Sequence, residues 1–306
     1  MLSSNAKFFA LAVLLITAFN TSFGQQDPIY TQSSFNILQF NPAYTGSKDA
    51  ISCIATYRHQ WSGIEGAPRS FNVGVHSPIG KNISLGLNFV HDKVGVTKYN
   101  APSIMAAYRV NFKSSFLQLG LQGTLELYQN EYASIATTTP QDPSFSENEN
   151  VTLGNFGLGA YYAGEKLYCG LSLPTLLNHA SYYSSQGSGQ ERYHHVYGLI
   201  GYIVPINKEF VFRPSIVTRW SSGNTLYADI NATAIFNDFI WMGLSYKTTN
   251  VMAILCQLHF KNEMYIGYSY DIGLSDNSIL RSSTHEVIIG IDVFSSKKRF
   301  ASPRYF

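Results

Sequence analysis

The chain has 306 residues, of which 13% are charged and 14% aromatic, and its formal net charge is +2. Soluble domains carry about 25% charged residues, so the composition argues against an ordinary soluble fold. A mean hydropathy of -0.04 is too low for a bundle of membrane helices, and the small net charge gives no reason to expect a nucleic-acid partner.

The N-terminal residues 1–24 are typical of a secretory signal peptide. Lys7 supplies a positive start, residues 8–19 are largely apolar, and small residues precede a cleavage point before Gln25. A membrane anchor is the weaker interpretation, because a spanning helix needs about 20 apolar residues. We expect residues 25–49 to form an N-terminal extension, either a plug inside a barrel or a periplasmic segment.

From residue 50 onward, short segments alternate between apolar and polar side chains. Leu119 and Leu121 alternate with Gln118 and Gln122, so that strand has one apolar and one polar face. The repetition predicts an all-β fold, a transmembrane outer-membrane β-barrel of about 14 antiparallel strands covering 50–294. The predicted strands are 50–58, 69–77, 82–91, 102–112, 115–127, 152–163, 166–173, 193–204, 208–220, 224–236, 239–247, 251–260, 262–273 and 284–294.

The connections between these segments alternate in length. Tight turns such as 78–81 and 237–238 alternate with connections that include the long loops 128–151 and 174–192. Outer-membrane barrels have short periplasmic turns and longer outer loops, so we expect the tight turns to face the periplasm. The basic C-terminal tail, 295–306, would then also be periplasmic.

Several charged residues fall on the polar faces of the predicted strands. A mixed set of inward charges is normally a network that bridges the lumen, and a transport site is the second interpretation. The candidate lumen network consists of Arg109, Arg213, Arg219, Asp229, Asp271 and Glu286.

No catalytic constellation emerges from the sequence. His194 and His195 are neighbours, so in a strand they point to opposite faces and are poorly placed to share a metal ion. The scattered Cys53, Cys169 and Cys256 give neither a disulfide framework nor a paired metal spacing. The sequence therefore predicts no catalytic residue, no cofactor and no metal, although an outer-membrane enzyme assembled from distant strands stays open as a third interpretation.

A series of short motifs runs through the chain in a distinctive order. Pro42 restricts Asn41 to extended conformations just before the barrel, and Trp61 would suit an interfacial aromatic belt. The motifs are Asp27-Pro28-Ile29-Tyr30, Asn41-Pro42-Ala43-Tyr44, Tyr57-Arg58-His59-Gln60-Trp61, Gly66-Ala67-Pro68-Arg69 and Gly267-Tyr268-Ser269-Tyr270-Asp271. In this order they resemble the PorP/SprF family of the Bacteroidota type IX secretion system, and the resemblance covers essentially the whole mature chain.

This resemblance implies an integral outer-membrane component without enzymatic activity. Such a component would scaffold the secretion or surface display of cargo or gliding adhesins. Its implied partners are other type IX components, namely periplasmic ring lipoproteins, a peptidoglycan-binding protein and the translocon, together with outer-membrane lipid and, in some cases, one dedicated large secreted protein. The alternative is an outer-membrane channel for small solutes. The candidate partner-docking residues are Asn41, Pro42, Tyr57, Arg58, Gln60, Trp61 and Pro68.

Overall fold

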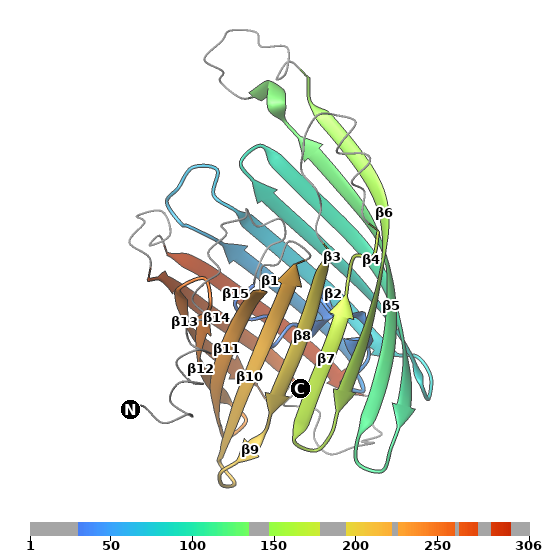
Figure 1. Ribbon diagram of the computed structural model, residues 1–306. Helices are drawn as coiled ribbons and strands as arrows, with labels where there is room; N and C mark the ends of the chain where they lie inside the picture. The colour runs from blue at the N-terminus through green and yellow to red at the C-terminus, as the bar shows by residue number, and fades with distance from the viewer. Residues whose placement is uncertain are drawn as a thin grey trace, which may run out of the picture.

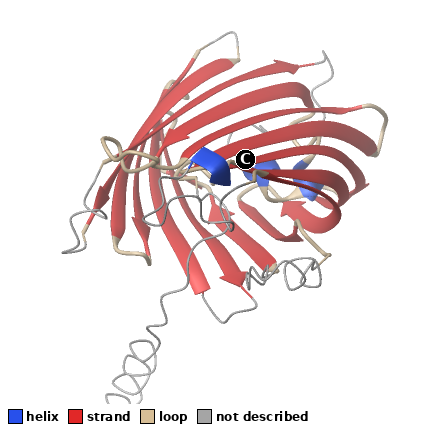
Figure 2. Ribbon diagram, turned by 90° about the horizontal axis from the view of Figure 1, so that it is seen from above, coloured by secondary structure: helices blue, strands red, loops and turns tan. Residues whose placement is uncertain are grey.

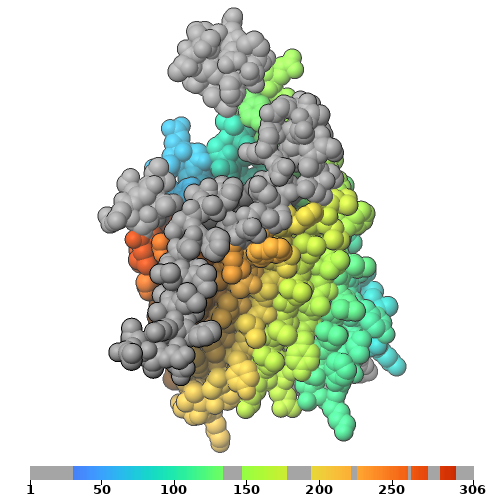
Figure 3. Space-filling model, in the orientation of Figure 1, coloured from blue at the N-terminus to red at the C-terminus, as the bar shows by residue number. Residues whose placement is uncertain are grey.

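The computed structural model describes six stretches of the chain, residues 30–134, 147–177, 194–221, 226–260, 263–274 and 283–294. The predicted signal peptide, the first residues of the extension and the basic tail lie outside these stretches. Figure 1 shows a single barrel whose strands follow the chain around the wall, and Figure 3 shows the same side of the barrel in space-filling form.

Fifteen strands build the wall. β8 and β9 both pair with β10 and are separated by one residue, so they act as one interrupted strand and the wall has the predicted 14 strands. The strands are β1 (Ala50–His59), β2 (Arg69–Pro78), β3 (Ile83–Val94), β4 (Thr97–Asn111), β5 (Phe116–Asn130), β6 (Glu149–Ala163), β7 (Leu167–Leu173), β8 (His195–Tyr202), β9 (Val204–Pro205), β10 (Phe210–Ser221), β11 (Leu226–Phe236), β12 (Ile240–Lys247), β13 (Val251–His259), β14 (Met264–Gly273) and β15 (Thr284–Phe294).

The sheet closes on itself. Neighbouring strands pair antiparallel in chain order, β10 pairs with β11, and the first strand pairs with the last from Ala50↔Phe294 to His59↔His285. Closure satisfies the backbone groups of every strand within the wall, which a bilayer interior requires. The view from above shows the ring of strands and the short helices associated with it (Figure 2).

The two faces of the wall differ as the alternation predicts. On β5, Leu119 and Leu121 are 53% and 66% exposed on the outside, whereas Gln118 and Glu126 are fully buried on the inside. Large apolar side chains are exposed in the same way on the other strands. An apolar exterior around a polar interior is the pattern of a barrel in a lipid bilayer.

The predicted strand limits differ from the observed ones mainly at the long-loop end. β4 begins at Thr97 rather than at residue 102, and β6 begins at Glu149 rather than at 152. The additional outward residues, which include Lys98, Asn100 and Asn150, are polar, so no apolar outer face reveals them. The additional residues nevertheless continue the ladder through Thr97↔Asn130 and Asn130↔Glu149.

Residues 30–49, here called the lumen segment, precede the first strand and are almost entirely buried. They contain two 3-10 helices, η1 (Ile37–Gln39) and η2 (Pro42–Tyr44); a third, η3 (Tyr132–Ser134), follows β5. None of the helices in the described stretches is long and apolar enough to cross a bilayer. The extended backbone expected for Asn41 is observed, and its side chain accepts a hydrogen bond from the Ala43 N–H at 2.9 Å, which caps η2.

The hydrophobic core lies between the lumen segment and the inner face of the wall. Ile37, Leu38, Phe40 and Tyr44 of the segment belong to one buried cluster with inward side chains of the strands, including Tyr161. The interior is therefore a packed core along part of its length, and the chain supplies that core from its own N-terminal side.

Candidate functional site in the barrel lumen

A buried charge cluster holds the beginning of the lumen segment. Arg58 of β1 places its two terminal nitrogens 3.0 Å from Asp271 of β14 and 3.0 Å from Glu286 of β15. Arg58 also donates to the Thr31 hydroxyl at 2.7 Å, and the N–H groups of Thr31 and Gln32 donate to the two oxygens of Glu286 at 2.7 and 2.8 Å. Segment and wall thus share one set of hydrogen bonds.

A second cation completes this cluster. The Lys247 ammonium of β12 lies 2.7 Å from the Asp271 carboxylate and 2.5 Å from the Thr31 hydroxyl. Together with Arg58, it balances the two carboxylates of Asp271 and Glu286. Buried ions are tolerated when they are paired and hydrogen-bonded in this way.

An arginine of β10 holds the middle of the lumen segment. Arg213 is fully buried and donates to the Ser34 carbonyl at 2.7 Å and to the Tyr168 hydroxyl at 2.8 Å. Its guanidinium also lies 4.7 Å from the centre of the Phe35 ring, a distance suited to a cation–π contact.

The end of the lumen segment is held near the short turns. Arg109 of β4 pairs with Asp49 at 2.5 Å and donates to the Gly46 carbonyl at 2.8 Å. On the opposite side of the closing seam, Lys48 lies 2.9 Å from Asp292 of β15. The segment therefore runs from the long-loop end, at Thr31, to the short-turn end, at Asp49.

The Asn41-Pro42-Ala43 motif packs against a part of the wall that is formed by glycines. Gly120 and Gly159 are paired across β5 and β6, and a Cβ on either would lie 2.2 Å from the Ala43 nitrogen or the Asn41 side-chain oxygen. Asn41 also donates to the Ala160 carbonyl at 3.1 Å. Only glycine allows the segment to approach the wall this closely.

The six residues of the candidate lumen network all face inward, and they contact different parts of the lumen segment and the wall. Asp271 and Glu286 share Arg58, whereas Arg109 and Arg213 bind other parts of the lumen segment. Asp229 lies opposite Lys247 in the β11–β12 ladder and accepts a hydrogen bond from Ser245, and Arg219 is 5.7 Å from the Tyr227 ring centre.

The candidate docking residues occupy three different environments. Asn41, Pro42 and Arg58 are buried with the lumen segment, while Tyr57 is 45% exposed on the outer face of the wall. Gln60, Trp61 and Pro68 belong to the loop between β1 and β2. There the Gln60 N–H donates to the Pro68 carbonyl, and the Trp61 N–H donates to the Thr284 hydroxyl at 3.1 Å.

Sequence reasoning missed the residues of the lumen segment that bind the wall. Thr31, Lys48 and Asp49 precede the first strand, where no periodicity marks an inward face. Lys247 occupies an inward position of a predicted strand, and its charge at a position that alternates with outward Tyr246 was the available signal.

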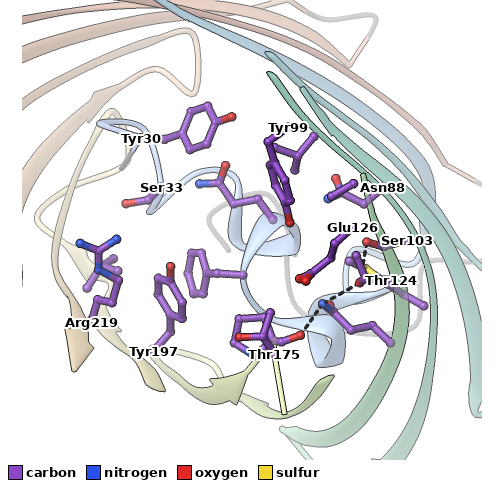
Figure 4. A pocket seen from close by; sticks show the side chains of 18 of the residues that line it. Tyr30, Ser33, Asn88, Tyr99, Ser103, Thr124, Glu126, Thr175, Tyr197 and Arg219 are labelled. Atoms are coloured by element: carbon purple, nitrogen blue, oxygen red, sulfur yellow. Dashed lines mark hydrogen bonds between the residues drawn. The ribbon is translucent and has the colours of Figure 1, made fainter. Parts of the chain in front are cut away.

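A cavity of about 120 Å³ remains above the lumen segment. Gln122 donates to the carbonyl of Pro174 at 2.9 Å, which brings the residues after β7 over one side of this space. Figure 4 shows the aromatic and polar side chains around it, which include Tyr30, Tyr99, Glu126, Tyr197, Arg219 and Tyr227. Across the described stretches, no three His, Cys, Asp or Glu side chains come together as a metal site requires.

Comparison with known proteins gives one family. A family model described as "Type IX secretion system membrane protein PorP/SprF" matches residues 22–291. No curated protein matches the sequence.

Solved outer-membrane channels share only a broad likeness with this barrel. The NanC porin is 12% identical, with 80% of this chain and 100% of that chain covered and a TM-score of 0.38. The TodX monoaromatic hydrocarbon channel is 9% identical, with 82% and 91% covered and a TM-score of 0.42.

Proposed function

This chain belongs to the PorP/SprF family of type IX secretion system membrane proteins, and we propose that it serves secretion as a non-enzymatic scaffold. The closed wall with its apolar exterior makes it an integral outer-membrane protein. In this role it holds other secretion components, and the large proteins they display, at the membrane.

The observation that carries the proposal is the occupied lumen. A channel for solutes needs a continuous wet path, whereas here residues 30–49 cross the interior and are fixed at their beginning, middle and end by Arg58, Arg213 and Arg109. These hydrogen bonds come from buried charged groups, and a hydrogen bond to a charged group contributes about 1.5–3 kcal/mol. A barrel closed by its own chain suits a rigid platform better than a pore.

The loop between β1 and β2 is the surface best suited to hold a partner. Its backbone is tied to neighbouring loops, because the Ser62 N–H donates to the Ser283 carbonyl at 2.7 Å and the Gly95 N–H donates to the Gly66 carbonyl at 2.8 Å. Binding residues concentrate on loops that a rigid scaffold positions. We place the partner-docking role of Trp61 and Pro68 on this loop, at the long-loop end of the barrel.

The alternative function, a channel for small solutes, is favoured by the cavity above the lumen segment. Its aromatic and charged lining resembles that of a small-ligand site. Passage through the barrel would require the lumen segment to leave, because the cavity lies against Phe40 and Gln39 of that segment.

A secretion assay tests the scaffold proposal. Deletion of the gene, in a strain without a compensating paralogue, should reduce surface display of type IX cargo while small-solute uptake stays normal. Complementation with Trp61→Ala should restore display only in part. The matched control is Trp220→Ala, since Trp220 also lies near the long-loop end but is exposed on the outer face of β10, whereas Trp61 is half-buried.

Copurification from native outer membranes gives a second readout, and heat-modifiable gel mobility verifies that each variant barrel has assembled. Normal cargo display in the deletion strain, with impaired solute uptake, would reject the scaffold and favour the channel.

A further inference from the structure

The outer wall carries an apolar hollow over strands β2 to β6. Its volume is about 580 Å³, and the surface that it exposes is almost wholly apolar, although Asn88, Ser103, Thr124 and Asn155 also border it. Its aliphatic and aromatic side chains point outward, into the bilayer. They include Val73, Leu87, Phe89, Ile104, Leu125 and Phe156.

The hollow exists because three positions interrupt the outer surface. Gly123 and Gly154 face outward, and a Cβ added to either would meet no atom within 4 Å. Pro102 has no N–H to give to the ladder, and the β4–β5 pairing skips from Asn100↔Leu127 to Ser103↔Thr124 around it. The floor of the hollow is therefore backbone, flanked by larger side chains.

A row of basic residues lies on the same face toward the long loops. Arg69, Lys93 and Lys98 are aligned across β2, β3 and β4 by the pairs Arg69↔Lys93 and Lys93↔Lys98. Val73, Phe89 and Pro102 form a parallel row within the hollow.

Each basic residue is four positions along its own strand from a residue of the hollow, which at about 3.3 Å per residue is about 13 Å. Residues an even number of positions apart in a strand lie on the same face, so each basic residue and its partner in the hollow both lie on the outer face.

The row has an excess of positive charge. Lys98 pairs with Glu131, while Arg69 and Lys93 are exposed. Among the described residues, all other Lys and Arg side chains face the lumen, belong to the lumen segment or lie at the short turns. The three cations are thus concentrated at one sector of the long-loop rim, directly beyond the apolar hollow.

We propose that this sector is a binding seat for a phosphorylated glycolipid of the outer leaflet. The Arg69–Lys93–Lys98 row binds the phosphate groups and the hollow over Gly123 and Gly154 receives an acyl chain. Basic side chains at a membrane rim attract anionic headgroups in general, but a general belt would be spread around the barrel. Here the basic row and the apolar hollow lie on the same strands, β2, β3 and β4. The choice of leaflet rests on the expected placement of the long loops outside the cell.

Lipid binding by the full-length protein in detergent micelles tests the seat, with native mass spectrometry as the readout. The probes are lipid A and, separately, phosphatidylglycerol, which share phosphate chemistry but differ in headgroup and number of acyl chains. The seat variant is Arg69→Gln/Lys93→Gln/Lys98→Gln. The control variant, Lys81→Gln/Lys113→Gln/Lys208→Gln, removes three charges from the short turns at the opposite rim.

We expect wild-type protein to bind lipid A more tightly than phosphatidylglycerol. The seat variant should lose about tenfold or more in affinity for lipid A, since it removes the basic side chains that attract the phosphate groups, and the control variant should keep wild-type affinity. A Gly123→Leu variant, which fills the hollow and keeps the charges, should also weaken binding. Equal loss in the seat and control variants, no loss in the seat variant, or equal binding of the two lipids would overturn the proposal.

Discussion

Arg58→Met should loosen the beginning of the lumen segment and destabilise the whole barrel. Arg58 makes two buried ion pairs, each at 3.0 Å, and its partners are at most 4% exposed. Removing one member of a buried pair costs about 3–5 kcal/mol, because the remaining charge stays buried. Asp271 keeps Lys247 at 2.7 Å, and Glu286 keeps two backbone N–H groups. These remaining contacts place the expected loss near the lower limit, at about 3 kcal/mol.

The assay is equilibrium unfolding in guanidinium chloride of the barrel refolded into lipid vesicles, followed by tryptophan fluorescence. The matched control is Arg69→Met, which makes the same change on the outer face near the same rim and should cost about 0.5 kcal/mol or less. Adding Glu286→Gln to Arg58→Met should recover part of the loss, because it removes one unpaired charge. A loss below about 1 kcal/mol for Arg58→Met, or an equal loss for both arginine variants, would refute the role given to the cluster.

Three further changes test the remaining features. Gly120→Ala should displace the lumen segment and cost about 1–3 kcal/mol by overpacking, whereas Gly123→Ala, three residues along the same strand, should be nearly neutral; thermal unfolding compares them. Leu121→Arg should cost about 2–4 kcal/mol if it lies at the bilayer midplane, while Thr124→Arg, which points toward the cavity, should insert normally in a vesicle-folding assay. An epitope tag in the loop between β1 and β2 should be accessible on intact cells, and one at Asn237-Asp238 only after the membrane is breached; reversed accessibility would contradict the orientation.

The sequence was sufficient to predict the barrel because one physical rule covers the whole wall. Each strand separates lipid from a polar interior, so alternation recurs in every segment, and Leu119 beside Gln118 carries the same information as Val287 beside Glu286. The predicted strand limits were wrong where the outer face becomes polar, as at Lys98 and Asn150, since a strand beyond the membrane has no apolar outer face to mark it.

The arrangement within the lumen was harder to predict. Inward charges such as Arg213 could be assigned to the lumen from alternation, but their partners come from residues 30–49, which have no periodicity, and from backbone carbonyls such as that of Ser34, which no sequence pattern identifies. Asn41 and Arg58 were singled out together as docking residues, whereas the structure places them at different wall contacts of one buried segment. A motif order typical of a family does not distinguish a surface that binds a partner from a segment that fills the fold.

The conductance of the purified barrel in planar lipid bilayers tests most directly whether the lumen segment closes the barrel. If residues 30–49 close the lumen, the wild-type protein should insert without producing a stable ohmic pore, and a variant that lacks residues 30–47 should conduct, provided that its heat-modifiable mobility shows an assembled barrel. Porin-like steps from the wild-type protein, equal to those of the deletion variant, would contradict a closed scaffold and identify the barrel as an open channel.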